Sequence, residues 1–479
     1  MNKKLMAVAV ASALGAPGLA VAQVGSSPGI TLYGRLDSAI MSNKFAATVT
    51  APTGNPAAAT PNFVPSAAID ELKKGDIFSA GNAMGVRGRE DLGGGTAVWF
   101  QLETGVWPDG RLDAAATTGN QWGGRNSGLG ISSSWGDIMY GIWDMPYKLA
   151  YGTSNSITSG PFSAAGIIMG NGDSTGALPN AKCTGTISNT TGTGPSGSAQ
   201  NVCVTEAIGG TTQFSRRVNN TVQYWSPVIN GLQFRLATAL ANYQSPGTAQ
   251  FPSGLPKAKM MSGSVTWSRG PLAVAAGYES HEGFRPGTAA GQNPNPKDTA
   301  FQIGAKWNLG LGEVGVGYEK LSYGDNGAAT TGTAASTKMD VPAFVVNGRA
   351  NLGPGALWAG YSKTAGGKNC TNPTNANYVT VNGSAACSVA LNAGQAKMMT
   401  LGYDYVLSKR TKMYLAYNKI DNGLATNYYY IAGPAGNNGG ASVGGTAITG
   451  TAAPFNGTAG GVAQGTDVTS FAFGIQHTF

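Results

Sequence analysis

The clearest alternation of hydrophobic and polar residues lies at the end of the chain, at 467–479. Phe471, Phe473, Ile475, His477 and Phe479 fall on one parity, and small or polar residues fall on the other. Because successive side chains of a β-strand point to opposite faces, this pattern predicts a strand with one apolar and one polar face. A soluble sandwich would bury the apolar face in a core. A membrane barrel would turn that face to lipid and the polar face to a wet lumen.

Segments of the same kind recur from residue 30 onward, and the connections between them are in turn short and long. Consecutive glycines, as at 93–95, predict tight turns, because hairpins need positive φ angles that glycine adopts without strain. The pattern predicts sixteen strands, at 30–41, 82–90, 96–106, 123–133, 137–144, 218–225, 232–240, 259–267, 272–279, 300–308, 313–322, 341–351, 356–363, 397–406, 411–420 and 467–479. Lipid cannot satisfy the open edges of a sheet, so we expect an all-β fold: a closed 16-stranded antiparallel up-and-down transmembrane β-barrel with long external loops.

Composition favours the same class of protein. Charged residues make up 11% of the chain and 73 of its 479 residues are glycine, against usual values of about 25% and 7%. A chain with so few charges would form a poor soluble surface. A lipid-facing wall with frequent bends and turns would explain both the low charge and the high glycine content. After residue 22 there is no apolar run long enough for a spanning helix, which excludes a protein built from helical spans.

Aromatic residues gather near the ends of the expected strands. We interpret them as an interfacial girdle, with core packing as the alternative. They are Trp99, Trp107, Tyr140, Trp143, Trp267, Trp307, Tyr403 and Tyr405.

The first 22 residues have the three parts of a secretory signal. Lys3 and Lys4 precede a short apolar run, and an A-x-A cleavage site ends at Ala22. We therefore expect a signal peptide at 1–22 and a mature barrel at 23–479. Without the two signal lysines, 29 basic and 23 acidic residues leave a net charge of +6.

Four cysteines occur as two close pairs in Gly/Thr/Asn-rich stretches, without the C-x-x-C spacing of a thiolate metal site. Proximity predicts two loop disulfides, Cys183–Cys203 and Cys370–Cys387, although four cysteines allow three connectivities. Closing a loop of this size would stabilise the fold by nominally about 3 kcal/mol.

The longest connection, at 145–217, is unlike the others. A connection of this length in a compact domain is usually functional or disordered, and a barrel of 16 strands is wide enough to hold a channel. We expect residues 145–170 of this third loop to fold inward and narrow the lumen.

Charged residues on the lumen parity are the candidates for control of ion passage, because a ring of one sign attracts the opposite ion. The basic candidates are Arg35, Arg87, Arg89, Arg235 and Lys306, joined near strand ends by Arg125 and Arg217. The acidic candidates are Asp37, Glu103 and Asp404. The arginine excess and the positive net charge predict a mild anion preference.

An enzyme is the competing class, but the two histidines are poorly placed for one. His477 lies on the outward parity, and His281 is expected in a solvated loop beside Glu282, so we predict no catalytic residues, cofactor or metal site. An exported adhesin or structural sandwich is a third interpretation, and it would be soluble without detergent.

Several segments resemble the general diffusion porins of Gram-negative outer membranes, especially the beta-proteobacterial type. They are ITLYGRLD at 30–37, GVRGREDLGGG at 85–95, FQLE at 100–103, NNTVQY at 219–224, LSKRT at 407–411 and GIQHTF at 474–479. The resemblance implies a homotrimer in the outer membrane, in contact with lipid and lipopolysaccharide but not nucleic acid. Each subunit would be a water-filled pore for ions and small hydrophilic solutes. The family's strand five commonly ends Gly-Arg-Gln, but this chain reads Gly-Ile-Trp at 141–143, and its third loop lacks the usual Asp-Pro-Phe-Gly-like segment. A substrate-specific channel for a sugar or small organic acid therefore stays open.

Overall fold

The structure is a computed structural model. It describes residues 29–47, 72–79, 82–106, 123–157, 159, 162, 186–187, 200–201, 214, 217–240, 259–282, 297–323, 339–364, 379–381, 384–387, 395–422, 442–443, 446–447, 455–456, 461–462 and 466–479.

Long strands make up most of the described chain, with one short helix and one 3-10 turn. The strands of the main sheet are β1 (Gly29–Ala47), β2 (Leu72–Ser79), β3 (Ala83–Gly93), β4 (Thr96–Gly105), β5 (Ser127–Ser133), β6 (Gly136–Asp144), β9 (Arg217–Trp225), β10 (Leu232–Ala239), β11 (Lys259–Arg269), β12 (Leu272–Glu282), β13 (Lys297–Asn308), β14 (Gly312–Tyr323), β15 (Met339–Leu352), β16 (Gly355–Thr364), β19 (Ala396–Val406), β20 (Thr411–Asn422) and β25 (Thr466–Thr478). The helical elements are α2 (Pro146–Tyr151) and η2 (Gly152–Ser154). Four small hairpins are formed by β7 (Thr186–Ile187) with β8 (Gln200–Asn201), β17 (Val379–Val381) with β18 (Ser384–Cys387), β21 (Ser442–Val443) with β22 (Thr446–Ala447), and β23 (Phe455–Asn456) with β24 (Gly461–Val462).

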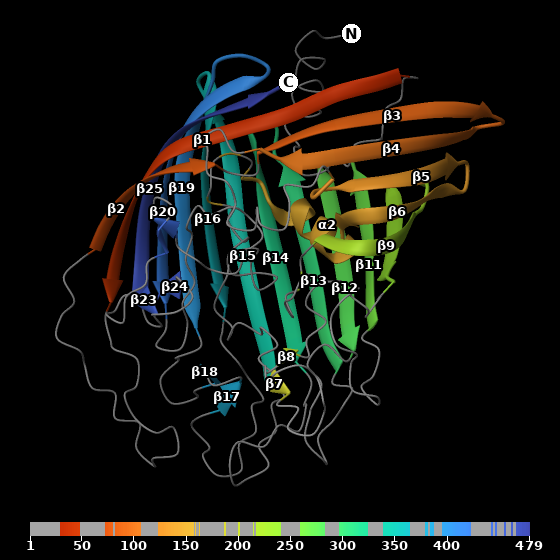
Figure 1. The fold of residues 1–479 in the computed structure, drawn as a ribbon. Coiled ribbons are helices and arrows are strands. Elements are labelled where there is room, and N and C mark those ends of the chain that lie inside the picture. The colour runs from red at the N-terminus through yellow and green to blue at the C-terminus, as the bar shows by residue number, and fades with distance from the viewer. Residues whose placement is uncertain are drawn as a thin grey trace.

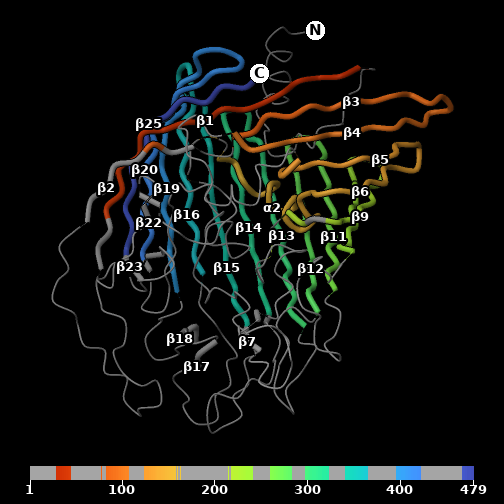
Figure 2. The backbone as a smooth tube through the Cα atoms, in the orientation of Figure 1, coloured from red at the N-terminus to blue at the C-terminus, as the bar shows by residue number. Residues whose placement is uncertain are grey.

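The main sheet closes on itself through β1 and β25. Consecutive strands pair antiparallel around the ring, and β1 pairs with β25 from Arg35–Thr478 to Ala47–Thr466. β1 also pairs with β3 through its first half and with β2 through its second half, so β2 and β3 are two parts of one barrel strand. The 17 strands of the sheet therefore form a 16-stranded barrel, as predicted (Figures 1 and 2).

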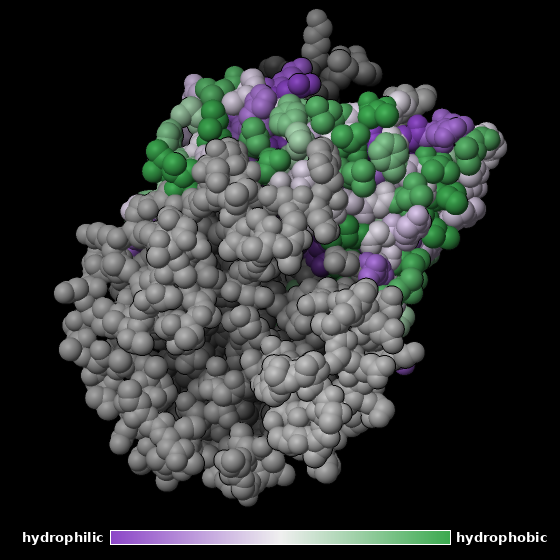
Figure 3. Space-filling view, viewed as in Figure 1, coloured by the Kyte–Doolittle hydropathy of each residue, from purple (hydrophilic) through white to green (hydrophobic). Residues whose placement is uncertain are grey.

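The two faces of the wall differ as the alternation predicts. On β25, Phe471, Phe473 and Ile475 are about half exposed on the outside, whereas Ser470 and Ala472 point inward and are buried. The same alternation continues around the ring, and hydrophobic side chains cover much of the described outer surface that Figure 3 shows in colour. An exposed apolar face on every long strand is what a lipid-facing barrel requires.

The turns and the seam explain several glycines. Gly93, Gly94 and Gly95 have φ angles of 85°, 62° and 77°, as expected for the tight turn between β3 and β4. At the seam, the backbone N–H groups of Gly34 and Phe479 each donate to the other's carbonyl oxygen, at 3.1 and 3.0 Å. The chain end thus closes the barrel against its first strand.

The structure corrects the extent of the early strands. The second barrel strand does not begin at residue 82, because β2 adds residues 72–79 beyond a break, and β1 continues to Ala47. The expected strand at 123–133 is shorter, since β5 begins at Ser127.

The structure also corrects the aromatic girdle. Tyr140 and Trp307 are exposed on the outer wall, as expected, but Trp99 and Trp143 point inward and are 1% and 3% exposed. They pack with Met139 and Trp225 in a cluster on the inner face, with the Trp99 and Trp225 rings stacked at 5.8 Å. Trp107 lies outside the described residues.

No helix in the described ranges has the length and apolar character needed to cross a membrane.

Candidate functional site

The third loop enters the barrel where β6 ends, and its described residues run along the inner wall, as predicted for the first part of 145–170; residues 163–170 lie outside the described residues. We call residues 145–157 with Ser159 and Phe162 the belt. Its first part is α2, which packs against β11, β12 and β13 inside the curve of the wall (Figures 1 and 2). Polar groups of the wall hold this helix: Ser262 Oγ accepts from the Tyr147 N–H at 2.9 Å, and the Tyr147 hydroxyl donates to buried Glu319 at 2.6 Å.

The far end of the belt is held by a charged centre on β19 and β20. Ser159 Oγ donates to Asp404 at 2.6 Å and accepts from Lys412 Nζ. Asp404 is fully buried and also accepts from Arg349 at 2.6 Å and from the Trp358 indole at 3.0 Å. The described belt therefore spans the inner wall from β10, β11, β12 and β13, which α2 contacts, to Asp404 on β19 and Lys412 on β20.

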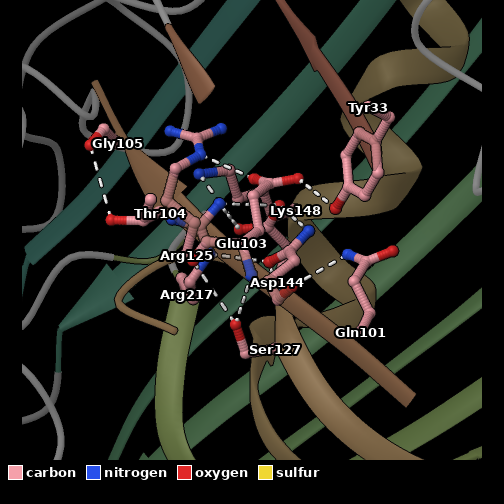
Figure 4. Close-up of polar contacts among 11 residues, drawn as sticks. Tyr33, Gln101, Glu103, Thr104, Gly105, Arg125, Ser127, Asp144, Lys148 and Arg217 are labelled. Atoms are coloured by element: carbon pink, nitrogen blue, oxygen red, sulfur yellow. Dashed lines mark hydrogen bonds and ion pairs between the residues drawn. The ribbon is translucent and has the colours of Figure 1, made fainter. Parts of the chain in front are cut away.

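A second charged group lies at the origin of the belt, where five side chains from β4, the segment before β5, β6, α2 and β9 converge (Figure 4). Arg125 pairs with Glu103 at 2.6 Å. Asp144, the last residue of β6, pairs with Arg217 at 3.3 Å and with Lys148 of α2 at 3.4 Å. Arg125 and Arg217, the two basic candidates near strand ends, are thus both brought into this group.

Arg87 joins the same group through an aromatic ring. Its guanidinium carbon lies 4.9 Å from the centre of the Tyr33 ring, and the Tyr33 hydroxyl donates to Glu103 at 3.0 Å. Among the described residues Arg87 forms no ion pair. It therefore supplies a positive charge that no described carboxylate neutralises.

Arg35 and Asp37 connect the two groups along β1. They pair with each other at 2.8 Å, and Asp37 also accepts from the Tyr414 hydroxyl at 2.7 Å and from Gln476 at 2.7 Å. The inner wall thus carries a continuous charged arc from β15 through the seam to β9. We call it the basic arc; its basic members are Arg349, Lys412, Arg35, Arg87, Arg125, Arg217 and Lys148, and its acidic members are Asp404, Asp37, Glu103 and Asp144.

Three sequence candidates lie outside the basic arc. Arg89 pairs with Asp91 near the β3–β4 turn at 3.3 Å, and Lys306 pairs with Glu313 at 3.6 Å. Arg235 is 7% exposed, and its guanidinium carbon lies 5.1 Å from the centre of the Trp225 ring.

Sequence reasoning missed four members of the arc: Asp144, Lys148, Arg349 and Lys412. The parity of β15 and β20 was a usable signal for Arg349 and Lys412, since Arg349 shares a face with Asn347 and Lys412 shares one with Asn418. Lys148 had no such signal, because its position depends on where the belt docks.

His281 contradicts the expectation of a solvated loop. It lies on β12 with no exposed surface, pairs with buried Glu279 at 2.9 Å and stacks on Phe214 at 4.4 Å. The inward parity of β12 places the ring against the wall. Of the four cysteines, Cys387 ends β18, and Cys183, Cys203 and Cys370 lie outside the described residues, so the disulfides stay predictions.

Comparison with protein families decides the identity. A family model described as Gram-negative porin matches residues 7–425. The chain belongs to the Gram-negative porins. Accordingly, this porin lies in the outer membrane and forms a channel.

Individual relatives of this porin are distant. Outer membrane porin protein 32 of Delftia acidovorans is 25% identical over 317 residues, which cover 66% of this chain and 68% of that protein. An anion-selective porin from Comamonas acidovorans has a similar structure, with a TM-score of 0.57, 19% identity, and coverage of 94% and 99% of the two chains. OmpT of Vibrio cholerae has a TM-score of 0.51, 14% identity, and coverage of 95% and 100%. At these identities the solved structures support the fold alone.

Proposed function

We propose that this porin admits ions and small hydrophilic solutes by passive diffusion, without catalysis, and prefers anions. The observation that carries the proposal is the charge of the basic arc, whose seven basic and four acidic members leave a net charge of +3 beside the belt. Charges on a low-dielectric wall raise the local concentration of the opposite ion and bias permeation. The structurally similar porin of Comamonas acidovorans is anion-selective, which agrees with the proposal.

Reversal potentials across a planar bilayer with a KCl gradient test the anion preference. We expect a potential whose sign indicates that chloride is more permeant than potassium, and a decline in that preference as salt screens the arc. A potential of the opposite sign would contradict the proposal. Saturable block of the current by one sugar or organic acid, but not by solutes of similar size, would instead favour a substrate-specific channel.

We further propose that three copies assemble through the face formed by β5 and β6. These strands have 7 and 9 residues, whereas β15 has 14. With a rise of about 3.3 Å per residue and a tilt near 45°, seven residues span roughly 16 Å, less than the apolar band of about 25 Å. A second protein surface would cover the outward side chains of this low wall, and lipid and lipopolysaccharide would contact the taller strands.

Crosslinking of the detergent-extracted protein tests this assembly. The wild-type protein should give a trimer that heating dissociates. Ile131→Gln on β5 should weaken the trimer, whereas Val316→Gln on β14, equally exposed at 48%, should leave it intact. Equal behaviour of the two variants would place the contact elsewhere.

A further inference from the structure

The inner wall beneath η2 is lined by glycine. Gly304 on β13 faces Gly317 on β14 in the sheet register, and Gly315 on β14 faces Asn347 on β15. All four point inward, because Ile303, Val314, Val316 and Val346 beside them are exposed on the outer face. These four residues form one continuous patch, which we call the seat.

Ser154 packs closely against the glycines of the seat. A methyl group at Gly304 would lie 2.6 Å from Ser154 Cβ, and one at Gly315 would lie 2.1 Å from the Ser154 carbonyl oxygen. A methyl group at Gly317 would lie 3.0 Å from Val345 Cγ1 and 3.1 Å from Ser154 Oγ. Because Ser154 is 2% exposed, the belt touches the wall here without a gap that a side chain could fill.

Asn347 fixes the belt in this position from the side. Its amide group donates to the Ser154 carbonyl oxygen at 2.8 Å, and its own oxygen accepts from the Ser156 N–H at 2.6 Å. Asn347 is 3% exposed, so both bonds form away from bulk water. The side-chain N–H and C=O groups of Asn347 thus bond the backbone of Ser154 and Ser156. Together they fix both the position of the belt along the wall and its distance from the wall.

We propose that the seat determines the size limit of the channel. The belt is held at both ends, at the origin group and at Asp404, so any atom added beneath its middle displaces it toward the open lumen. The absence of side chains at three inner-wall positions therefore keeps the belt close to the wall and the passage wide. The inference rests on the proposed channel function and adds the residues that set its width.

Single-channel conductance and liposome swelling with sugars of increasing size test the seat. Gly304→Ala should lower the conductance and the largest sugar admitted. Adding Ser154→Gly to Gly304→Ala removes the atom that the new methyl group meets and should restore both values toward those of Ser154→Gly alone. Gly348→Ala is the matched control, because this neighbour of Asn347 faces outward and its added methyl group would meet no heavy atom closer than 3.4 Å.

A Gly304→Ala channel that conducts like Gly348→Ala would overturn the inference, and so would a loss that the double variant fails to restore. Should Gly304→Ala not assemble, Gly317→Ala carries the same test with its longer contact, and an unchanged conductance would again overturn the inference. The wild-type reversal potential tests the proposed anion preference separately, so the two proposals can fail independently.

Discussion

Replacing Arg87 by glutamine should reduce the anion preference more than its share of the total charge suggests. Arg87 rests on the Tyr33 ring and forms no ion pair among the described residues, so its removal leaves no described carboxylate without its cation. The Glu103–Arg125 and Asp144–Arg217 pairs stay in place. The cost to stability is then about 0.5–1 kcal/mol for the lost cation–π contact.

The effect on permeation follows from Coulomb's law. An ion passing at about 6 Å interacts with one charge by about 0.7 kcal/mol at the dielectric constant of water. Screening at 0.1 M salt, where the Debye length is about 10 Å, reduces this to about 0.4 kcal/mol. Anions lose this attraction and cations lose the equal repulsion, so their permeability ratio changes by about 0.8 kcal/mol, or about fourfold.

The salt dependence provides the second part of the prediction. At 1 M salt the Debye length falls to about 3 Å and the same change shrinks to less than about 1.5-fold. Reversal potentials of Arg87→Gln and wild type at both salt concentrations measure it. Arg269→Gln, which removes an exposed charge at the end of β11, is the control for net charge. A ratio unchanged at low salt, or shifted equally by the control, would refute the reasoning.

Three further predictions concern the belt and the seam. Tyr147→Phe removes a 2.6 Å hydrogen bond to buried Glu319, so the free energy of unfolding in detergent should fall by about 1.5–3 kcal/mol. An unchanged denaturation midpoint would show that this bond does not stabilise the belt. Asp404→Asn removes the fully buried carboxylate that Arg349 contacts at 2.6 Å. We expect the free energy of unfolding to fall by about 3–5 kcal/mol and the anion preference to become stronger. A weaker anion preference would contradict the assignment of this charge to the passage. Gly34→Val places its Cβ about where the ring of the C-terminal phenylalanine lies, 2.3 Å away, and should lower the yield of heat-modifiable barrel in refolding assays, whereas Gly263→Ala on the outer wall should refold like wild type.

The barrel itself could be predicted because each long strand repeats the same two-residue period. Where that period was obscured, the prediction failed: β2 carries Lys73, Lys74 and Asp76 on both parities, so no apolar face was visible there. Trp99 is a different kind of miss. It shares the parity of Gln101 and Glu103, and giving this parity more weight than the residue type would have placed its ring on the inner face.

The charged arc and the belt were only partly predictable. Strand parity identified Arg35, Asp37 and Glu103, but ion-pair partners come from segments far apart in the chain, as with Arg125 and Glu103 or Arg349 and Asp404. The seat was hidden for another reason. Glycine in a strand usually weakens it or marks a bend, and only the docked Ser154 shows what these glycines accommodate.

The pairing of β1 with β25 has a consequence for how the molecule is made. Arg35 and Thr478 are register partners although 478 minus 35, or 443, residues separate them. Closing so long a loop costs conformational entropy before any contact at the seam can compensate for it. Folding that depends on contacts between such distant residues is slow. A chain in which β25 is not yet paired cannot close the ring, so the facing edges of β1 and β20 keep unpaired backbone groups until it docks. We therefore expect assembly of the barrel to need chaperones that cover these two sheet edges until β25 pairs with them.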